Sequence, residues 1–260
     1  MPRKRFGQNF LQDQNVLDQI IAAIASDEQD HLVEIGPGRG ALTDRLAPRC
    51  GRLDLIELDR DLVALLRPRW APSAHVAVHQ ADALRFDFRS LMVDGRPLRV
   101  VGNLPYNIST PLLFHLFEQA DAIRDMHFML QKEVVERLCA SPGSTDYGRL
   151  SVMAAYHGRA EKLFEVPPES FFPQPRVMSA VVRLFPHPVK PGGAAADDLK
   201  RVVAAAFSQR RKTLRNALRG VVEPDDLIRL GIDPGARAEN LALDDFLAIA
   251  ACHGEASARS

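Results

Sequence analysis

Val33-Glu34-Ile35-Gly36-Pro37-Gly38-Arg39-Gly40 places a G-x-G-x-G turn directly between a short apolar run and a helical pattern. Glycine lets the backbone turn tightly and approach a ligand closely. The spacing differs from the G-x-G-x-x-G fingerprint of dinucleotide-binding enzymes. Taken alone the turn is a weak signal, because bare turn geometry also accounts for it.

Short apolar runs alternate with helical patterns on both sides of this turn, which predicts βαβ units and a parallel sheet covered on both faces. The expected strands are residues 32–35, 53–56, 75–79, 98–101 and 126–130. The expected helices are residues 13–25, 41–46, 61–66, 110–118 and 132–138. Two later β-rich runs, 160–166 and 177–185, flank a Pro-rich segment and predict a closing antiparallel hairpin. The fold class is therefore α/β, with a Rossmann-like, mostly parallel sheet.

The pattern becomes helical after a Pro- and Gly-containing stretch. We predict a first domain over residues 1–186, a linker over 187–198 and a small helical domain over 199–260. The basic N-terminus is not followed by an apolar segment typical of a secretory signal, and no apolar run is long enough to span a bilayer. The three cysteines lack metal-ligand spacing, as do the histidines. We expect a cytoplasmic, monomeric protein without a metal or a membrane partner.

Acidic residues follow the next two predicted strands. Glu57 ends the second strand, and Asp82 follows the third. A carboxylate at the first position suits the two hydroxyls of an unphosphorylated ribose, and one at the second could accept from an adenine amino group. Each acid alone could be a solvated loop residue, but ligands of open α/β sheets bind at the carboxyl ends of strands. The set fits NAD and S-adenosylmethionine equally well.

The fourth strand discriminates between these cofactors, because Asn103-Leu104-Pro105-Tyr106 follows it. An adenine amino nitrogen is a poor nucleophile, and two acceptors that bind its N–H groups would free its lone pair. The Asn103 side chain and a main-chain carbonyl near Leu104 could supply them, since Pro105 keeps the preceding residue extended. Tyr106 offers a surface on which an extruded base can stack. The alternative is a Pro-induced turn with a core tyrosine.

The chain resembles the bacterial small-subunit (16S) ribosomal RNA adenine N6,N6-dimethyltransferase family over nearly its whole length. Besides the glycine turn, Glu57, Asp82 and the N-L-P-Y motif, five further segments carry the resemblance. They are residues 6–11 (FGQNFL), 128–134 (FMLQKEV), 147–152 (YGRLSV), 171–177 (FFPQPRV) and 207–214 (FSQRRKTL). Ala81 precedes Asp82 where the family often has glycine, a departure that keeps the carboxylate.

The resemblance implies the cofactor S-adenosyl-L-methionine and a set of residues that bind it. These are Gln8, Asn9, Leu11, Gly36, Gly38, Gly40, Glu57, Leu58, Asp82, Ala83 and Asn103. Asn9 and Leu11 would close over the methionine part, and Asn103 would lie between cofactor and target. Asn103, Leu104, Pro105 and Tyr106 form the expected catalytic set, to which Phe172 is added as a candidate for the opposite wall of the base pocket.

The resemblance also implies the substrate: two adjacent adenines near the 3′ end of small-subunit ribosomal RNA, each dimethylated within a precursor of the small subunit. The formal net charge of the chain is +0. Residues 200–219 nevertheless contain no acid, and Arg210, Arg211, Lys212 and Arg215 are expected to contact RNA phosphates. A solvated helix face is the alternative for this segment.

Three other functions compete with this interpretation. A large-subunit RNA adenine methyltransferase would share the catalytic core. A non-catalytic ribosome-assembly factor could use the same scaffold, but it would not need Glu57, Asp82 and Asn103 together. A nicotinamide dehydrogenase explains the glycines but leaves residues 103–106 without a role.

Overall fold

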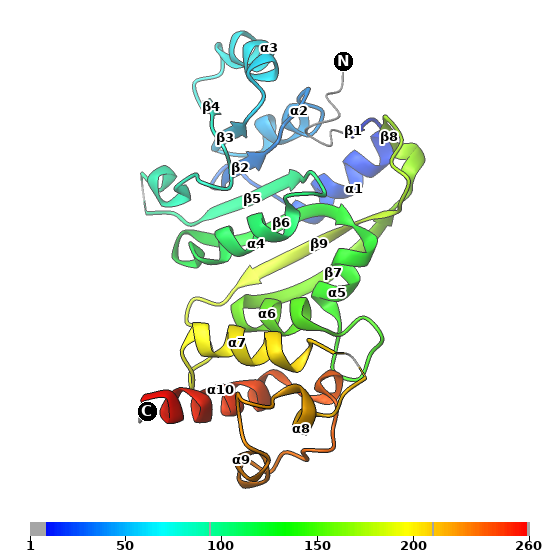
Figure 1. Ribbon diagram of the computed structural model, residues 1–260. Coiled ribbons are helices and arrows are strands. Elements are labelled where there is room, and N and C mark those ends of the chain that lie inside the picture. Colours follow the sequence, from blue (N-terminus) through cyan, green and yellow to red (C-terminus); the bar gives the residue numbers. More distant parts are fainter. Residues whose placement is uncertain (1–8, 94, 210, 259–260) are drawn as a thin grey trace. The chain divides into compact units, whose positions relative to one another are not determined.

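The computed structural model of the protein describes residues 9–93, 95–209 and 211–258 (Figure 1). A seven-stranded sheet has the order β4-β3-β2-β5-β6-β9-β7, and β1 and β8 form a separate two-stranded sheet. The strands are β1 (Phe10–Leu11), β2 (His31–Ile35), β3 (Arg52–Glu57), β4 (Val76–Gln80), β5 (Leu98–Asn103), β6 (Ile123–Gln131), β7 (Gly158–Val166), β8 (Phe171–Phe172) and β9 (Ser179–Pro186).

Ten α-helices connect or follow these strands in the described residues. They are α1 (Gln14–Ile24), α2 (Thr43–Leu46), α3 (Arg60–Trp70), α4 (Ser109–Phe117), α5 (Lys132–Cys139), α6 (Arg149–His157), α7 (Ala196–Ala206), α8 (Leu214–Ala217), α9 (Pro224–Arg229) and α10 (Leu243–Ala258).

The pairing of the strands confirms the predicted fold class. β4, β3, β2, β5 and β6 are mutually parallel along the sheet, whereas β9 runs antiparallel to β6. The chain moves from β2 toward one edge through β3 and β4, and then returns to β5 on the other side of β2. β2 and β5 therefore flank the topological switch point, where an open α/β sheet forms a crevice at its carboxyl edge.

The sheet owes its burial to helices on both faces. Leu17, Ile20 and Ile24 of α1 pack in one cluster with Leu32, Leu53 and Val101, which project from neighbouring strands. Figure 1 shows α4 lying over β5 and β6, and its Leu112, Leu113 and Leu116 are buried. Strands buried on both faces become continuous apolar runs, which explains why β2 is buried at all five positions.

Most predicted elements are present, but two features were missed. The sequence analysis placed no helix over α6, and it did not foresee that Phe10 and Leu11 pair with Phe172 and Phe171. The β1–β8 pair joins residues that are far apart in the chain, and two residues are too short a run to show strand periodicity. This pair attaches the N-terminal segment to the FFPQPRV segment.

The described residues divide into two compact units. The first contains the described residues up to Val135 together with Arg159–Pro188, and the second contains residues 136–158 and those from Val189 onward. In the second unit, α6 and α7 pack against each other and against α10. Residues 136–158 therefore group with the helical unit, whereas the predicted boundary assigned them to the first domain.

Tyr147 explains much of the YGRLSV segment in the second unit. Its side chain is buried, its hydroxyl donates to the Leu241 carbonyl at 2.8 Å, and its ring meets the Phe207 ring edge-on. The Ser151 hydroxyl donates to the Arg137 carbonyl at 2.6 Å. These contacts give the segment a structural role.

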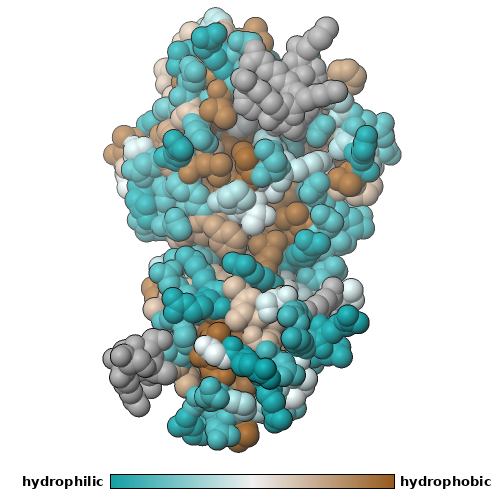
Figure 2. All heavy atoms as spheres, viewed as in Figure 1, coloured by the Kyte–Doolittle hydropathy of each residue, from teal (hydrophilic) through white to brown (hydrophobic). Residues whose placement is uncertain are grey.

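Among the described residues, no helix is long and apolar enough to span a membrane. On the face shown in Figure 2, apolar side chains reach the surface in small groups among hydrophilic ones.

The amino-terminal end of the sheet carries a buried ion network centred on Arg99. Its guanidinium pairs with Asp125 at 3.0 Å and with Asp30 at 2.7 Å, and it donates to the Ile24 carbonyl at 2.6 Å. Burial alone would raise the pKa of each carboxyl, but the bonds to Arg99 lower the pKa of Asp30, and those to His127 and Arg99 lower the pKa of Asp125. The network ties the end of α1 to β5 and β6.

We expect Arg99→Met to lower the free energy of unfolding by about 3 kcal/mol, because it leaves buried carboxylates short of partners. Urea unfolding at neutral pH measures this change. Arg89→Met is the matched control, since it removes an exposed pair with Asp121 and should cost less than about 1 kcal/mol. Equal effects of the two variants would contradict the structural role of the network.

Candidate active site

A cavity of about 610 Å³ opens at the carboxyl edge of the sheet in the first unit. This size is typical of pockets for small-molecule ligands. Most of the predicted cofactor and catalytic residues line the cavity. They are Asn9, Leu11, Gly36, Gly38, Glu57, Leu58, Asp82, Ala83, Asn103, Leu104, Pro105 and Tyr106.

The glycine turn forms one wall. Gly36 and Gly38 have φ values of +66° and +59°, in the left-handed region that side chains disfavour. A Cβ on Gly38 would also lie 3.0 Å from the Phe10 ring, so the turn is closely covered there. Gly40, by contrast, is absent from the described lining and approaches the Arg69 side chain. Its predicted contact with the cofactor remains a prediction.

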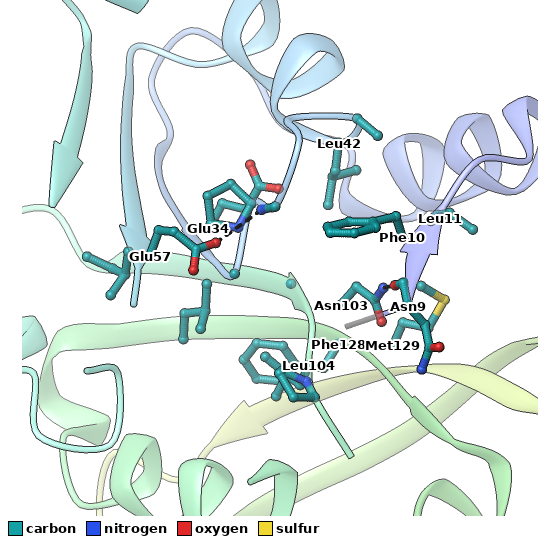
Figure 3. A pocket seen from close by; sticks show the side chains of 18 of the residues that line it. Asn9, Phe10, Leu11, Glu34, Leu42, Glu57, Asn103, Leu104, Phe128 and Met129 are labelled. Carbon is teal, nitrogen blue, oxygen red and sulfur yellow. Dashed lines mark hydrogen bonds between the residues drawn. The ribbon is translucent and has the colours of Figure 1, made fainter. Parts of the chain in front are cut away.

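Glu57 connects this turn to the end of β3. Its side chain is buried, and its carboxylate accepts from the Gly38 amide at 3.3 Å and from the Asp59 amide at 2.8 Å. Burial raises the pKa of the Glu57 carboxyl. Figure 3 shows the carboxylate directed toward the turn. A carboxylate held here can still accept from vicinal hydroxyls, which suits a ribose without a phosphate.

Asp82 and Leu58 complete this side of the cavity. The Asp82 carboxylate accepts from the Leu84 amide at 3.0 Å, which fixes the loop after β4. The Leu58 side chain is 51% exposed although it lines the cavity, so it offers an apolar surface to a planar ring. The glycine turn, the ribose-type acid and this acid–apolar pair fit the groups of S-adenosylmethionine.

The N-L-P-Y motif follows β5 directly across the switch point. A Cβ on Gly102 would lie 2.5 Å from the Ile35 carbonyl oxygen, so only glycine lets β5 pass β2 this closely. The Leu104 amide donates to the Met129 carbonyl at 3.2 Å, which holds the motif against β6. Tyr106 and Ser179 share a hydroxyl hydrogen bond of 2.9 Å, and burial raises the pKa of the tyrosine.

The N-terminal segment lies beside this motif. The Asn103 side-chain nitrogen donates to the Asn9 carbonyl at 2.9 Å, and Leu11 is buried in the core. Figure 3 shows Asn9 adjacent to Asn103 and the Phe10 ring beside the glycine turn. Gln8, the remaining predicted residue of this segment, lies outside the described residues.

Phe172 does not join the described lining of the cavity, and its side chain is 56% exposed. Its backbone pairs with Phe10, so it lies near the N-terminal segment, but the base-pocket wall remains a prediction. Phe171 is buried in the core, as expected for ordinary packing.

Several residues that line the cavity were missed by the sequence analysis, among them Phe10, Arg39 and Glu34. Phe10 and Arg39 pack together, with the guanidinium 5.0 Å from the ring centroid. Glu34 is 2% exposed, and its carboxyl group accepts from the Thr43 hydroxyl at 2.6 Å. Burial raises the pKa of Glu34 to about 8. The signal was present, since an acid inside the apolar run before a glycine turn is unusual.

The basic segment lies in the second unit. Arg211, Lys212 and Arg215 are exposed, and Arg210 lies outside the described residues. Arg211 also lines a small polar pocket with Ser144, Thr145 and Arg237. The segment is not one continuous helix, because α7 ends at Ala206 and α8 begins at Leu214. Because these side chains are exposed, the structure agrees equally with phosphate contacts and with a solvated face.

Several described histidines make hydrogen bonds within the scaffold. His31 and His79 both contact the buried Asp54 at 2.6 Å. Among the described residues, no group of three or more histidine, cysteine or acidic side chains is arranged to hold a metal ion.

Together, the strand order, the glycine cradle and the N-L-P-Y turn at the switch point define a Rossmann-like methyltransferase. The family model described as "Ribosomal RNA adenine dimethylase" matches residues 2–253. The chain belongs to this family, and it is an S-adenosylmethionine-dependent methyltransferase, as the resemblance predicted.

Individual relatives agree with this assignment. The chain is 58% identical over 249 residues to a protein from Methylococcus capsulatus named ribosomal RNA small subunit methyltransferase A, with 96% of each chain covered. It is 57% identical to the protein of that name from Alcanivorax borkumensis, over 95% of this chain and 89% of that one.

Solved structures share the fold. A dimethyladenosine transferase from Plasmodium falciparum has a TM-score of 0.78 at 26% identity, and 92% of this chain and 95% of that chain are covered. The 23S rRNA methyltransferase ErmE has a TM-score of 0.71 at 25% identity, with 93% and 98% covered.

Glu34→Gln should change how stability depends on pH. The folded carboxyl has a pKa of about 8, above the ordinary value of 4.5, so the folded state retains a proton that the unfolded chain loses between these values. The free energy of unfolding of the wild type should therefore fall relative to that of the variant as pH rises from about 4.5 to 8.

Urea unfolding at several pH values across this window measures the difference. Glu169→Gln is the control, because it removes an exposed carboxylate that does not line the cavity. A wild-type minus Glu34→Gln difference that stays constant with pH would contradict a neutral buried carboxyl.

Proposed function

We propose that the protein transfers methyl groups from S-adenosylmethionine to N6 of two adjacent adenines near the 3′ end of small-subunit ribosomal RNA, giving N6,N6-dimethyladenosine. Membership of the dimethylase family supports the reaction. The names of the relatives that are 57–58% identical support the small-subunit substrate. The observation that carries the chemistry is Asn103, which lines the same cavity as Gly36, Glu57 and Asp82.

The cofactor supplies an electrophilic methyl group, and the chain must present the adenine amino nitrogen to it. Asn103 accepts one amino N–H through its side-chain oxygen, and the main-chain carbonyl of Leu104 accepts the other. The two bonds draw the nitrogen lone pair out of conjugation with the ring. The Tyr106 ring stacks on the extruded base. Catalysis then rests mainly on orientation, which requires no strong general base.

Glu57 holds the ribose hydroxyls and Asp82 the adenine of the cofactor in this proposal, while Asn9 and Leu11 cover its methionine part. Phe172 forms the opposite wall of the base site. Gly36 and Gly38 allow the backbone to approach the ligand, with Gly40, Leu58, Ala83 and Gln8 as further contacts. The exposed Arg211, Lys212 and Arg215, with Arg210, contact phosphates of the RNA.

The proposed context is a late step of ribosome assembly in the cytoplasm, in which a monomer binds a precursor of the small subunit. Along the chain, we propose residues 1–186 as the methyltransferase domain, 187–198 as a linker and 199–260 as the RNA-contacting helical domain, with residues 136–158 of the first segment packed into the helical unit. Family membership supports ribosomal RNA as the partner.

Transfer of labelled methyl groups to unmethylated small subunits tests the function. We expect N6,N6-dimethyladenosine in the digested RNA with wild type, and a loss of about 100-fold or more with Asn103→Ala, because an interaction with the reacting group is removed. Label confined to large-subunit RNA would overturn the substrate. Binding to the small subunit without any transfer would favour an assembly factor.

Replacing Arg211, Lys212 and Arg215 by glutamine should weaken binding to the small subunit and flatten its salt dependence. Each phosphate contact contributes about 0.7–0.9 to the slope of log affinity against log salt, so three contacts account for about 2.1–2.7. Binding titrations between low and moderate salt measure the slope.

The matched control replaces three exposed arginines on separate elements, Arg49, Arg67 and Arg229. It loses the same total charge and should leave the slope nearly unchanged. Equal slopes for both triple variants would contradict specific phosphate contacts of the 211–215 segment.

A further inference from the structure

The hydrogen bond from the Asn103 side chain to the Asn9 carbonyl sets the orientation of the Asn103 side-chain amide. An asparagine side chain has a donor end and an acceptor end of nearly the same shape, and its partners decide which end faces which group. The Asn9 main-chain carbonyl can only accept. At 2.9 Å it therefore binds the Asn103 nitrogen and turns the Asn103 oxygen away from itself.

The Asn9 carbonyl is itself held in place by the residues that follow it. The next residue, Phe10, packs its ring on Gly38 and beside Arg39, and Leu11 is buried in the core. β1 pairs with β8, and the Gln12 amide donates to the Ser170 carbonyl at 2.9 Å. Figure 3 shows Asn9 directly beside Asn103, with the Phe10 ring next to both. We call residues 9–12 the N-terminal strap.

We propose that the Asn9 main-chain carbonyl is a positioning group for methyl transfer: it holds the Asn103 amide with its nitrogen bound to the strap, so that the side-chain oxygen is the atom offered to the adenine amino group. Phe10 sets the position of this carbonyl. The inference rests on the proposed function, in which Asn103 accepts from the target. The opposite orientation of the amide would present a donor to an amino group, which cannot accept.

Asn103→Asp separates the two roles of the side chain. The aspartate keeps an acceptor for the target, but its ionised carboxylate would place an oxygen against the Asn9 carbonyl oxygen. Protonation of the carboxyl restores a donor for this carbonyl. A partly buried carboxyl next to an acceptor has a raised pKa, so protonation falls within the range in which activity can be measured.

The expected result is a pH-dependent defect. At pH 8, kcat of Asn103→Asp should be about 100-fold below wild type, because a misplaced acceptor is costly. The ratio of the two kcat values should rise toward one as pH falls to about 5.5. Asn240→Asp makes the same chemical change at an exposed position that does not line the cavity, and its ratio to wild type should stay constant with pH.

Hydrogen exchange gives a readout that does not depend on catalysis. In the protein without cofactor at pH 8, the amides of residues 10–12 should exchange faster in Asn103→Asp than in wild type, and not in Asn240→Asp. Phe10→Leu should have the same effect on the strap and should add little to the kcat defect of Asn103→Asp.

The outcomes distinguish the positioning role of the Asn9 carbonyl from the acceptor role of Asn103. If Asn103→Asp matches wild type at pH 8 with unchanged exchange while Asn103→Ala is inactive, the positioning role is overturned and the acceptor role stands. If Asn103→Ala retains activity, the proposed function of Asn103 fails first. A pH dependence shared by Asn240→Asp would likewise overturn the positioning role.

Discussion

The close passage of β2 and β5 is the constraint on which the site depends. The two strands are parallel neighbours, with Val33 opposite Val100 and Glu34 opposite Val101. One step further, a Cβ at residue 102 would meet the Ile35 carbonyl oxygen at 2.5 Å, so the pairing can continue only through glycine. Because the chain leaves β2 and β5 in opposite directions, the glycine turn and the N-L-P-Y turn face each other across one crevice. A cofactor and its target can then meet at Asn103.

Buried acidic side chains have different kinds of partner at the two ends of the sheet. At the amino end, Arg99 is paired with Asp30 and Asp125, and Asp54 accepts from His31 and His79. Such ion pairs hold the scaffold in one arrangement. At the carboxyl edge, Glu34 and Glu57 are buried against a cavity, with partners that are mainly a hydroxyl or main-chain amides. Burial raises the pKa of both carboxyls, as expected for groups whose environment a ligand completes.

Local sequence patterns were sufficient to predict most of the strands and of the residues that line the cavity among the predicted site residues. The glycine turn, Glu57, Asp82 and residues 103–106 each follow a strand whose apolar run is visible in the sequence, and parallel strands bring their carboxyl ends to one edge. The β1–β8 pair could not be predicted in this way, because Phe10 and Phe172 are separated by most of the chain and their strands have two residues each. The grouping of residues 136–158 with the helical unit also depends on tertiary packing of α6, which leaves no local signature.

Some residues of the family segments line the cavity, whereas others are buried and stabilise the fold. Asn103 and Glu57 line the cavity, whereas Tyr147 and Ser151 are buried and bonded within the second unit. A resemblance over such segments therefore identifies a scaffold as much as a reaction. ErmE is a 23S rRNA methyltransferase with the same fold at 25% identity, so the sheet and its crevice do not by themselves select the RNA. Selection must depend on surfaces that differ between such proteins, and the exposed cations of the second unit are the residues proposed here for contacts with the RNA backbone.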